Sequence, residues 1–195
     1  MNRVVLVIVG VLALVGSLAP SSRGDGESRR PDALSLEDIR ASLGRVHATS
    51  CHAREADHAF DYHEITRRVL GRHWRDRTEA ERAELVDLLR GHVLTWYTRL
   101  CQRQDFVQFD PIVRDGDRAV FSASAIREGH KVSVVYRLRS SDMKHWLVYD
   151  VEVAGRSHTR MLYFEFDRIL LNEGYAELVA RLTAEQDQRK AARTR

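Results

Sequence analysis

The segment from His145 to Leu182 changes its hydrophobic period once, and this change constrains the fold more than any other feature of the sequence. Residues 146–153 are rich in β-branched and aromatic side chains, which favour a strand. Beyond Gly155, apolar residues recur at helical spacing, first as far as Gly174 and then again after it. The sequence therefore predicts a strand followed directly by two helices, whose apolar faces need the strand's own sheet as a partner.

Alternation within this strand divides its side chains between two faces, because successive strand residues point to opposite sides of a sheet. The first face carries Leu147, Tyr149, Val151 and Val153, and the second carries Trp146, Val148, Asp150 and Glu152. The first is wholly apolar, so we expect it to face the core. Asp150 lies among apolar neighbours, and we interpret it as a structural hydrogen-bond or ion-pair partner and not as a general base.

Three earlier segments also alternate with a period of two, and they are residues 106–113, 119–126 and 131–139. The pairs Asp115-Gly116 and Glu128-Gly129 are turn signals between them. Together with 146–153, these segments predict an antiparallel meander of four strands. Because helices are expected before and after the strands, the predicted class is α+β, with helices packed on one face of the sheet and enclosing an apolar pocket.

Three helices are predicted before the strands. The first covers 35–46. The second begins at Asp61 and ends or bends at Gly71. Thr78 and Glu81 form a capping box that opens the third, whose apolar stripe continues for about six turns. The basic segment 186–195 is expected to be frayed.

Several short motifs occur in an order that is typical of one known family. Residues 146–157 read W-x-V-Y-D-V-x-V-x-G-x-S, and after an aromatic-bearing helix residues 174–182 read G-Y-x-x-L-V-x-R-L. The upstream motifs are Phe60-Asp61-Tyr62, Val69-Leu70-Gly71, Trp74, Thr78, Glu81-Arg82 and Tyr97. From Leu34 to Leu182 the chain resembles the MlaC family of periplasmic phospholipid-binding proteins. It departs from that family at Met161-Leu162-Tyr163, where the family often has a polar run.

The resemblance implies a protein that moves phospholipid across the periplasm between an outer-membrane lipoprotein complex and an inner-membrane ABC transporter complex. Such a carrier needs an apolar lining and no catalytic residue, cofactor or metal. In that family the ligand lies between sheet and helices, and combining this with the strand and helix periods predicts the lining. The predicted lipid-binding residues are Trp96, Tyr97, Phe121, Val132, Val134, Tyr136, Leu147, Tyr149, Val151 and Phe166. Phe166 is expected to pack on the sheet face that carries Tyr149 and Val151.

The residues themselves point to binding more than to catalysis. The sequence contains no glycine-rich phosphate loop, no G-x-S-x-G motif and no zincin spacing. Cys51, His52 and His58 lie close together but lack a fourth ligand, so no metal site is predicted. His145 and His158 are expected in turns that flank the last strand.

Two other functional classes stay open. One is a small-molecule enzyme on a cone-shaped fold of the nuclear-transport-factor-two type, which would need convergent polar residues inside its pocket. The other is an interaction module tethered to the inner membrane. Nucleic acid is not an expected partner, because the basic residues are not interleaved with stacking aromatics. The isoelectric point of about 9.1 fits either a solvated surface or attraction to anionic lipid headgroups or an acidic partner.

The N-terminal residues predict export. Arg3 precedes an apolar run from Val4 to Leu14, which suits residues 1–19 as a signal peptide. Pro20 directly follows the small-residue cleavage pattern, so an uncleaved anchor is the alternative. We expect a linker at 20–32, a single lipid-binding domain at 33–188 and a basic tail at 189–195. The predicted protein is a periplasmic monomer, tethered to the inner membrane if the signal is retained.

Cys51 and Cys101 are the two cysteines of a chain that carries an export signal, which favours a disulfide over two free thiols. Closing a loop of this size would contribute about 4 kcal/mol in the chain-entropy model. We expect thiol labelling of the denatured, unreduced protein to find no free thiol. Labelling at both cysteines before reduction would contradict the pairing.

Overall fold

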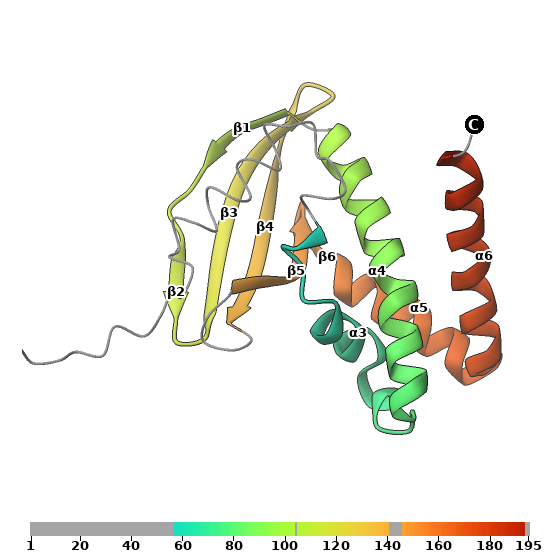
Figure 1. The fold of residues 1–195 in the computed structure, drawn as a ribbon. Helices are drawn as coiled ribbons and strands as arrows, with labels where there is room; N and C mark the ends of the chain where they lie inside the picture. Colours follow the sequence, from blue (N-terminus) through green and yellow to red (C-terminus); the bar gives the residue numbers. More distant parts are fainter. Residues whose placement is uncertain (1–56, 104, 141–145, 194–195) are drawn as a thin grey trace, which may run out of the picture. The chain divides into compact units, whose positions relative to one another are not determined.

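The structure is a computed structural model of the chain, and it describes residues 57–103, 105–140 and 146–193. This part contains one antiparallel sheet and four α-helices (Figure 1). The predicted α+β class is confirmed, whereas the predicted number of strands is wrong, because the sheet has six. The helix expected at 35–46 and the segments 1–19 and 20–32 lie outside the described residues.

The sheet is an antiparallel meander with a short strand at each end. Its strands are β1 (Asp105–Phe109), β2 (Val113–Asp115), β3 (Arg118–Arg127), β4 (His130–Ser140), β5 (Trp146–Val153) and β6 (Arg156–Ser157). They are ordered β1-β3-β4-β5-β6, and β2 also pairs with β3. The strand predicted at 106–113 is thus two strands, and it is interrupted around Pro111, which has no N–H to give to a ladder. β6 is too short to show an alternating pattern.

A β-bulge in β5 corrects the predicted division of its two faces. Leu138 of β4 is opposite Val148, but Arg137 is opposite Asp150, so Tyr149 is an extra residue without a partner in β4. An extra residue reverses the alternation on one side of itself. Val148 is therefore buried in phase with Val151, and Leu147 lies on the other face and is half-buried.

Two of the helices begin at the predicted caps. They are α3 (Tyr62–Leu70), the 3₁₀ helix η1 (Gly71–Trp74), α4 (Glu79–Gln102), α5 (His158–Asn172) and α6 (Tyr175–Arg193). Asp61 caps α3 by accepting a hydrogen bond from the Glu64 N–H at 2.9 Å. The predicted capping box is present in α4, where the Glu81 N–H donates to Thr78 Oγ1 at 3.2 Å and the Thr78 N–H donates to Glu81 Oε2 at 2.7 Å.

Gly71 ends α3 with a φ of +53°. A β-carbon at this position would lie 2.5 Å from the ring of Tyr163 in α5, so the crossing of the two helices requires the absence of a side chain. The C-terminal segment differs from its expected frayed state, since α6 continues to Arg193. Glu185 of α6 accepts a hydrogen bond from His92 of α4 at 2.9 Å, and this bond holds that part of α6 against α4. No described helix is both long and apolar enough to cross a membrane.

β5 connects the helices to the sheet at two positions, Val148 and Asp150. Ahead of α3, the Val148 N–H donates to the Ala59 carbonyl at 2.8 Å, and the Asp61 N–H donates to the Val148 carbonyl at 2.9 Å. Ahead of α5, Asp150 accepts hydrogen bonds from Ser157 Oγ at 2.6 Å and from the Thr159 N–H at 3.1 Å. The interpretation of Asp150 as a structural partner is therefore confirmed. Figure 1 shows β1 and β2 at the side of the sheet away from the helices.

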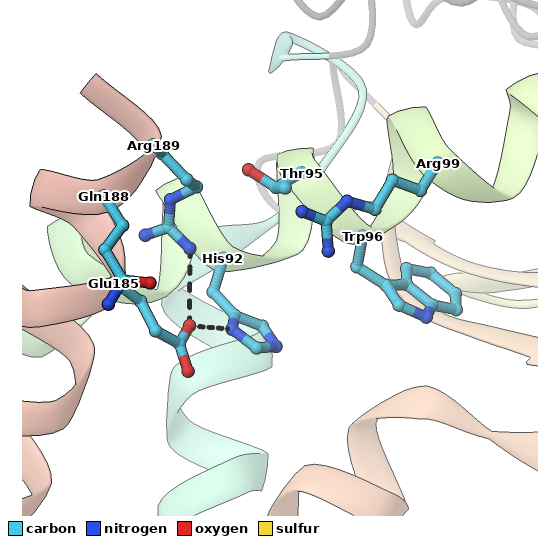
Figure 2. A pocket seen from close by; sticks show the side chains of 7 residues that line it. All are labelled: His92, Thr95, Trp96, Arg99, Glu185, Gln188 and Arg189. Carbon is cyan, nitrogen blue, oxygen red and sulfur yellow. Dashed lines mark hydrogen bonds and ion pairs between the residues drawn. The ribbon is translucent and has the colours of Figure 1, made fainter. Parts of the chain in front are cut away.

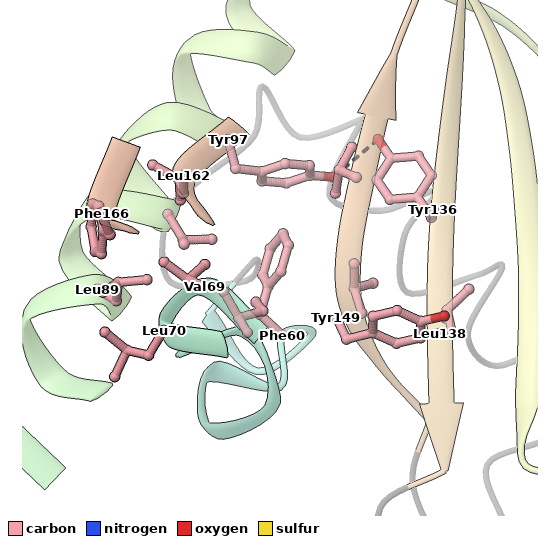
Figure 3. Close-up of a cluster of buried hydrophobic side chains, with 14 of the residues drawn as sticks. Phe60, Val69, Leu70, Leu89, Tyr97, Tyr136, Leu138, Tyr149, Leu162 and Phe166 are labelled. Atoms are coloured by element: carbon pink, nitrogen blue, oxygen red, sulfur yellow. Dashed lines mark hydrogen bonds between the residues drawn. The ribbon is translucent and has the colours of Figure 1, made fainter. Parts of the chain in front are cut away.

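The core lies between this sheet and α3, α4 and α5 (Figure 3). Phe60 lies in its middle and packs edge-on against Tyr97 of α4, with ring centroids 5.0 Å apart. Phe166 is buried on the helical side of the cluster near Leu89, and Figure 3 shows it well separated from Tyr149. The predicted packing of Phe166 against Tyr149 is therefore wrong, whereas its packing against Val151 stays a prediction.

Glu64 is a buried carboxylate that joins α3 to the sheet. It accepts hydrogen bonds at 2.7 Å from the guanidinium groups of Arg67 and Arg68, and Arg139 of β4 lies 2.9 Å away. Burial alone would raise its pKa, but the hydrogen bonds and charges of Arg67 and Arg68 outweigh burial and hold the pKa at about 2. The carboxylate is therefore ionised throughout the physiological range.

Replacing this carboxylate should weaken the fold in a pH-dependent manner. We expect Glu64→Gln to lower the free energy of unfolding at neutral pH by about 1.5–3 kcal/mol, the usual effect of hydrogen bonds to a charged group. Because the folded-state pKa is lowered from 4.5 to about 2, this contribution is complete above pH 4.5 and is lost as the pH falls towards 2. Urea unfolding across this range measures it. Glu128→Gln, at an exposed turn residue, is the control, and an equal loss in both variants would contradict the prediction.

Candidate functional site

Strand pairing brings most of the predicted lining together on the inner face of the sheet. Phe121 of β3 is opposite Tyr136 of β4, and Tyr136 is opposite Val151 of β5. Val134 belongs to the same face, and all four of these side chains are buried. Val132 is half-buried near the beginning of β4. The inner face is thus a continuous apolar surface across three strands.

Small and aromatic residues alternate in space on this face. β3 contributes Ala119, Ala123 and Ala125 beside Phe121. Three of these four side chains are therefore a single methyl group, and only Phe121 extends far from the strand. Phe109 of β1 stacks on Phe121 with ring centroids 5.6 Å apart. Because the alanine side chains are short, the space above β3 is filled by side chains from other strands and helices.

Two tyrosines span the distance between α4 and the sheet. Tyr97 projects from α4 and Tyr136 from β4, and Figure 3 shows their side chains meeting end to end. The two hydroxyl oxygens are 3.5 Å apart and both residues are buried. Burial raises the pKa of each phenol above its ordinary value, so both are neutral. The side chains of this pair reach across a layer of apolar atoms.

The remaining predicted residues lie in other places. Tyr149 is the bulge residue of β5, and the Arg68 guanidinium lies over its ring at 4.2 Å. Leu147 is on the face opposite Val148, and Phe166 is among the helices. Trp96 is half-buried and stacks on His158 of α5 with ring centroids 3.6 Å apart. It therefore points away from its neighbour Tyr97, and the structure does not bring it to the inner face.

Trp96 lines a pocket of about 380 Å³ between α4 and α6 (Figure 2). The lining residues are His92, Thr95, Trp96, Arg99, Glu185, Gln188 and Arg189. Glu185 contacts both His92, at 2.9 Å, and Arg189, at 3.4 Å. Its lining is about as polar as it is apolar and includes the charged side chains Arg99, Glu185 and Arg189, so it differs from the wholly apolar environment that acyl chains need.

His158 is the buried histidine that the sequence did not indicate. It was expected in a turn, but it is the first residue of α5 and is almost fully buried, and neither ring nitrogen has a hydrogen-bond partner among the described residues. Desolvation lowers its pKa to about 3, and the nearby His92 adds to the effect. Hydrophobic period does not indicate this burial, because a single residue between a turn and a helix belongs to no repeating pattern.

A second pocket, of about 260 Å³, lies where β5 meets α3 and α5. It is lined by Arg68, Asp150, Ser157, Thr159, Arg160 and Tyr163. Among the described residues there is no cluster of histidine, cysteine, aspartate and glutamate that could hold a metal ion. Cys101 is buried and has no free thiol, and its predicted partner Cys51 lies outside the described residues, as does His52. The pairing stays a prediction.

Comparison with known families matches residues 45–184 to the family described as MlaC protein. The chain belongs to the MlaC family. The match covers most of the chain and agrees with the order of motifs in the sequence. A solved structure with a similar fold is a phospholipid-binding protein from Ralstonia solanacearum in complex with a phospholipid. The similarity has a TM-score of 0.64 at 19% identity and covers 80% of this chain and 98% of that one. Curated protein sequences gave no match.

Exchanging His158 should change how stability depends on pH. Below pH 6.5 the unfolded chain binds a proton at this histidine, whereas the folded protein binds it only near pH 3. We therefore expect the free energy of unfolding to decrease as the pH falls from 6.5 to 3, with the slope that corresponds to about one proton. His158→Phe keeps a ring against Trp96 and removes this dependence. Chemical unfolding at several pH values compares the two proteins. His130→Phe, at an exposed histidine, should keep the wild-type slope, and a parallel curve for His158→Phe would contradict the prediction.

Proposed function

We propose that this protein is a phospholipid carrier that holds acyl chains between the inner face of the sheet and the helices. The observation that carries the proposal is the continuous apolar face formed by β3, β4 and β5, combined with membership of the MlaC family. The Ralstonia protein of similar fold, which was solved with a phospholipid, supports the same ligand class.

The attachment of the helices at β5 makes such binding physically reasonable. Hydrogen bonds join the layers at Val148 and Asp150, whereas the space above β3 and β4 is spanned by side chains such as Tyr97 and Tyr136. Side chains can change rotamer without breaking backbone hydrogen bonds. Acyl chains would therefore replace contacts between the aromatic side chains and the inner face, while the connections at β5 stay intact.

The energetics of acyl chains determine how a carrier works. Each buried methylene is worth about 0.8 kcal/mol against water, so release of two chains into water is unfavourable by tens of kcal/mol. Lipid is therefore exchanged only with another apolar environment. We propose that the protein acts in the periplasm, as a monomer, between an outer-membrane lipoprotein complex and an inner-membrane ABC transporter complex. No catalytic residue, cofactor or nucleic acid is part of this function.

The enzyme alternative requires polar groups that converge inside the core. On the inner face, the polar atoms of the named residues are the hydroxyls of Tyr97 and Tyr136, and both phenols are neutral because burial raises each pKa. Neither is a base at neutral pH, so this buried tyrosine pair offers no general base.

A charge placed on the inner face should abolish lipid binding. Val134→Asp introduces a carboxylate whose desolvation costs several kcal/mol. We expect solvent extraction and lipid mass spectrometry to find phospholipid in the wild-type protein and none in this variant. Val132→Asp, at a half-buried position, tests the same face with less risk to folding.

Lys131→Asp is the matched control, because Lys131 is adjacent in β4 but exposed. It should retain phospholipid. Circular dichroism must show each variant folded. A folded wild-type protein that carries no phospholipid, and takes none from vesicles, would refute the carrier function.

A further inference from the structure

α5 exposes apolar side chains on the side that faces away from the core. Met161, Phe164 and Leu171 are 49%, 58% and 61% exposed, and we call these three residues the α5 stripe. They follow the spacing i, i+3, i+10, which places them on one side of a helix over a length of about 15 Å. Single exposed apolar residues need no explanation, but an aligned set marks an interaction surface.

Arginines border the stripe. Arg168 lies within it, seven residues after Met161, and the Arg160 guanidinium lies 5.7 Å from the centre of the Phe164 ring. Both are exposed, and neither has a carboxylate partner in the described part of the chain. Glu165 is at the other border, and its charge acts on Arg181, which also pairs with Glu173 and Glu177. The stripe therefore combines apolar side chains with two exposed arginines that have no carboxylate partner among the described residues.

Arg160 also lines the 260 Å³ pocket beside the stripe. Arg68 lines the same pocket and donates its Nε–H to Glu64, and its two terminal nitrogens have no acceptor among the described residues. The pocket's carboxylate, Asp150, already accepts hydrogen bonds from Ser157 and Thr159. Two guanidinium groups therefore face a space next to an apolar surface, and guanidinium is the group that best matches phosphate oxygens.

We propose that α5 docks this protein on an anionic phospholipid surface. The α5 stripe enters the interface between headgroups and acyl chains, Arg168 contacts headgroups, and Arg160 with Arg68 binds one lipid phosphate in the adjoining pocket. Amphipathic helices bind membranes with this combination of apolar residues and flanking cations. The site is separate from the inner face of the sheet, so it goes beyond the carrier function and does not depend on it.

The charge distribution favours a membrane over a protein partner. A helix groove on a protein needs the apolar side chains alone. Arg160 and Arg168, which have no carboxylate partner in the described part of the chain, and the pocket that Arg160 lines each match a headgroup layer. Each arginine near an anionic membrane contributes about 1 kcal/mol, equivalent to about a fivefold change in binding.

Vesicle binding tests the proposal. We expect the wild-type protein to co-sediment with vesicles of phosphatidylethanolamine and phosphatidylglycerol, and to bind much less to phosphatidylcholine vesicles. The double variant Phe164→Ser/Leu171→Ser should lower binding by at least about tenfold, because two apolar side chains no longer leave water. Arg160→Gln should lower it about fivefold on the anionic vesicles.

Two exposed residues on the sheet provide matched controls. Val113→Ser removes an apolar side chain that is 68% exposed on β2, and Arg118→Gln removes an exposed arginine on β3. Both should bind vesicles like the wild type. Failure of the wild type to bind anionic vesicles, or equal binding by the double variant, overturns the proposal. Capture of the wild type but not the double variant by a purified protein, without vesicle binding, assigns the stripe to a protein partner and also overturns it.

The lipid content of the same samples separates this proposal from the carrier function. The stripe variants should retain the phospholipid of the wild-type protein, since their substitutions lie outside the core. Val134→Asp should lose phospholipid and still bind vesicles. Loss of phospholipid from the double variant, with vesicle binding intact, overturns the separate docking site.

Discussion

The attachment of the helices to one strand is the constraint on which this structure depends. β5 holds the start of α3 through backbone hydrogen bonds at Val148 and holds the start of α5 through Asp150. Helix α4 packs on α3, and α6 packs on α4 and α5, so that strand places α3 and α5 directly and α4 and α6 through them. The remaining strands can then present an apolar face whose opposite wall is made of side chains.

The bulge at Tyr149 makes this arrangement possible. Without the extra residue, either Val148 or Val151 would leave the core, because a strict alternation cannot bury both (they are an odd number of residues apart). With it, Val148 reaches the core, and Tyr149 is free to pack under Arg68 of α3. The network at Glu64 then joins α3 to β4 through Arg139. Local irregularity in one strand thus produces a well-defined connection between layers.

Sequence reasoning succeeded where a local rule determines the outcome. The caps at Asp61 and Thr78 and the turn at Glu128-Gly129 depend on neighbouring residues alone, and the structure has all three. The inner face of β3 and β4 followed from alternation. Leu147 was misplaced because a bulge leaves no mark in hydrophobic period, and Trp96 was misplaced because a broad helical stripe contacts more than one neighbour. The burial of His158 depends on tertiary packing around Trp96.

The attachment at β5 also has a consequence for the order of folding. Adjacent strands such as β3 and β4 are joined by a tight turn, so their contacts close short loops. The hydrogen bonds between Val148 and the segment 59–61 join parts that are separated by about 90 residues. Loop closure of that length is slow, and contact order predicts that such pairings form late. We expect the hairpin to form early and the helical layer to dock last, so that the apolar face is exposed transiently before it is covered.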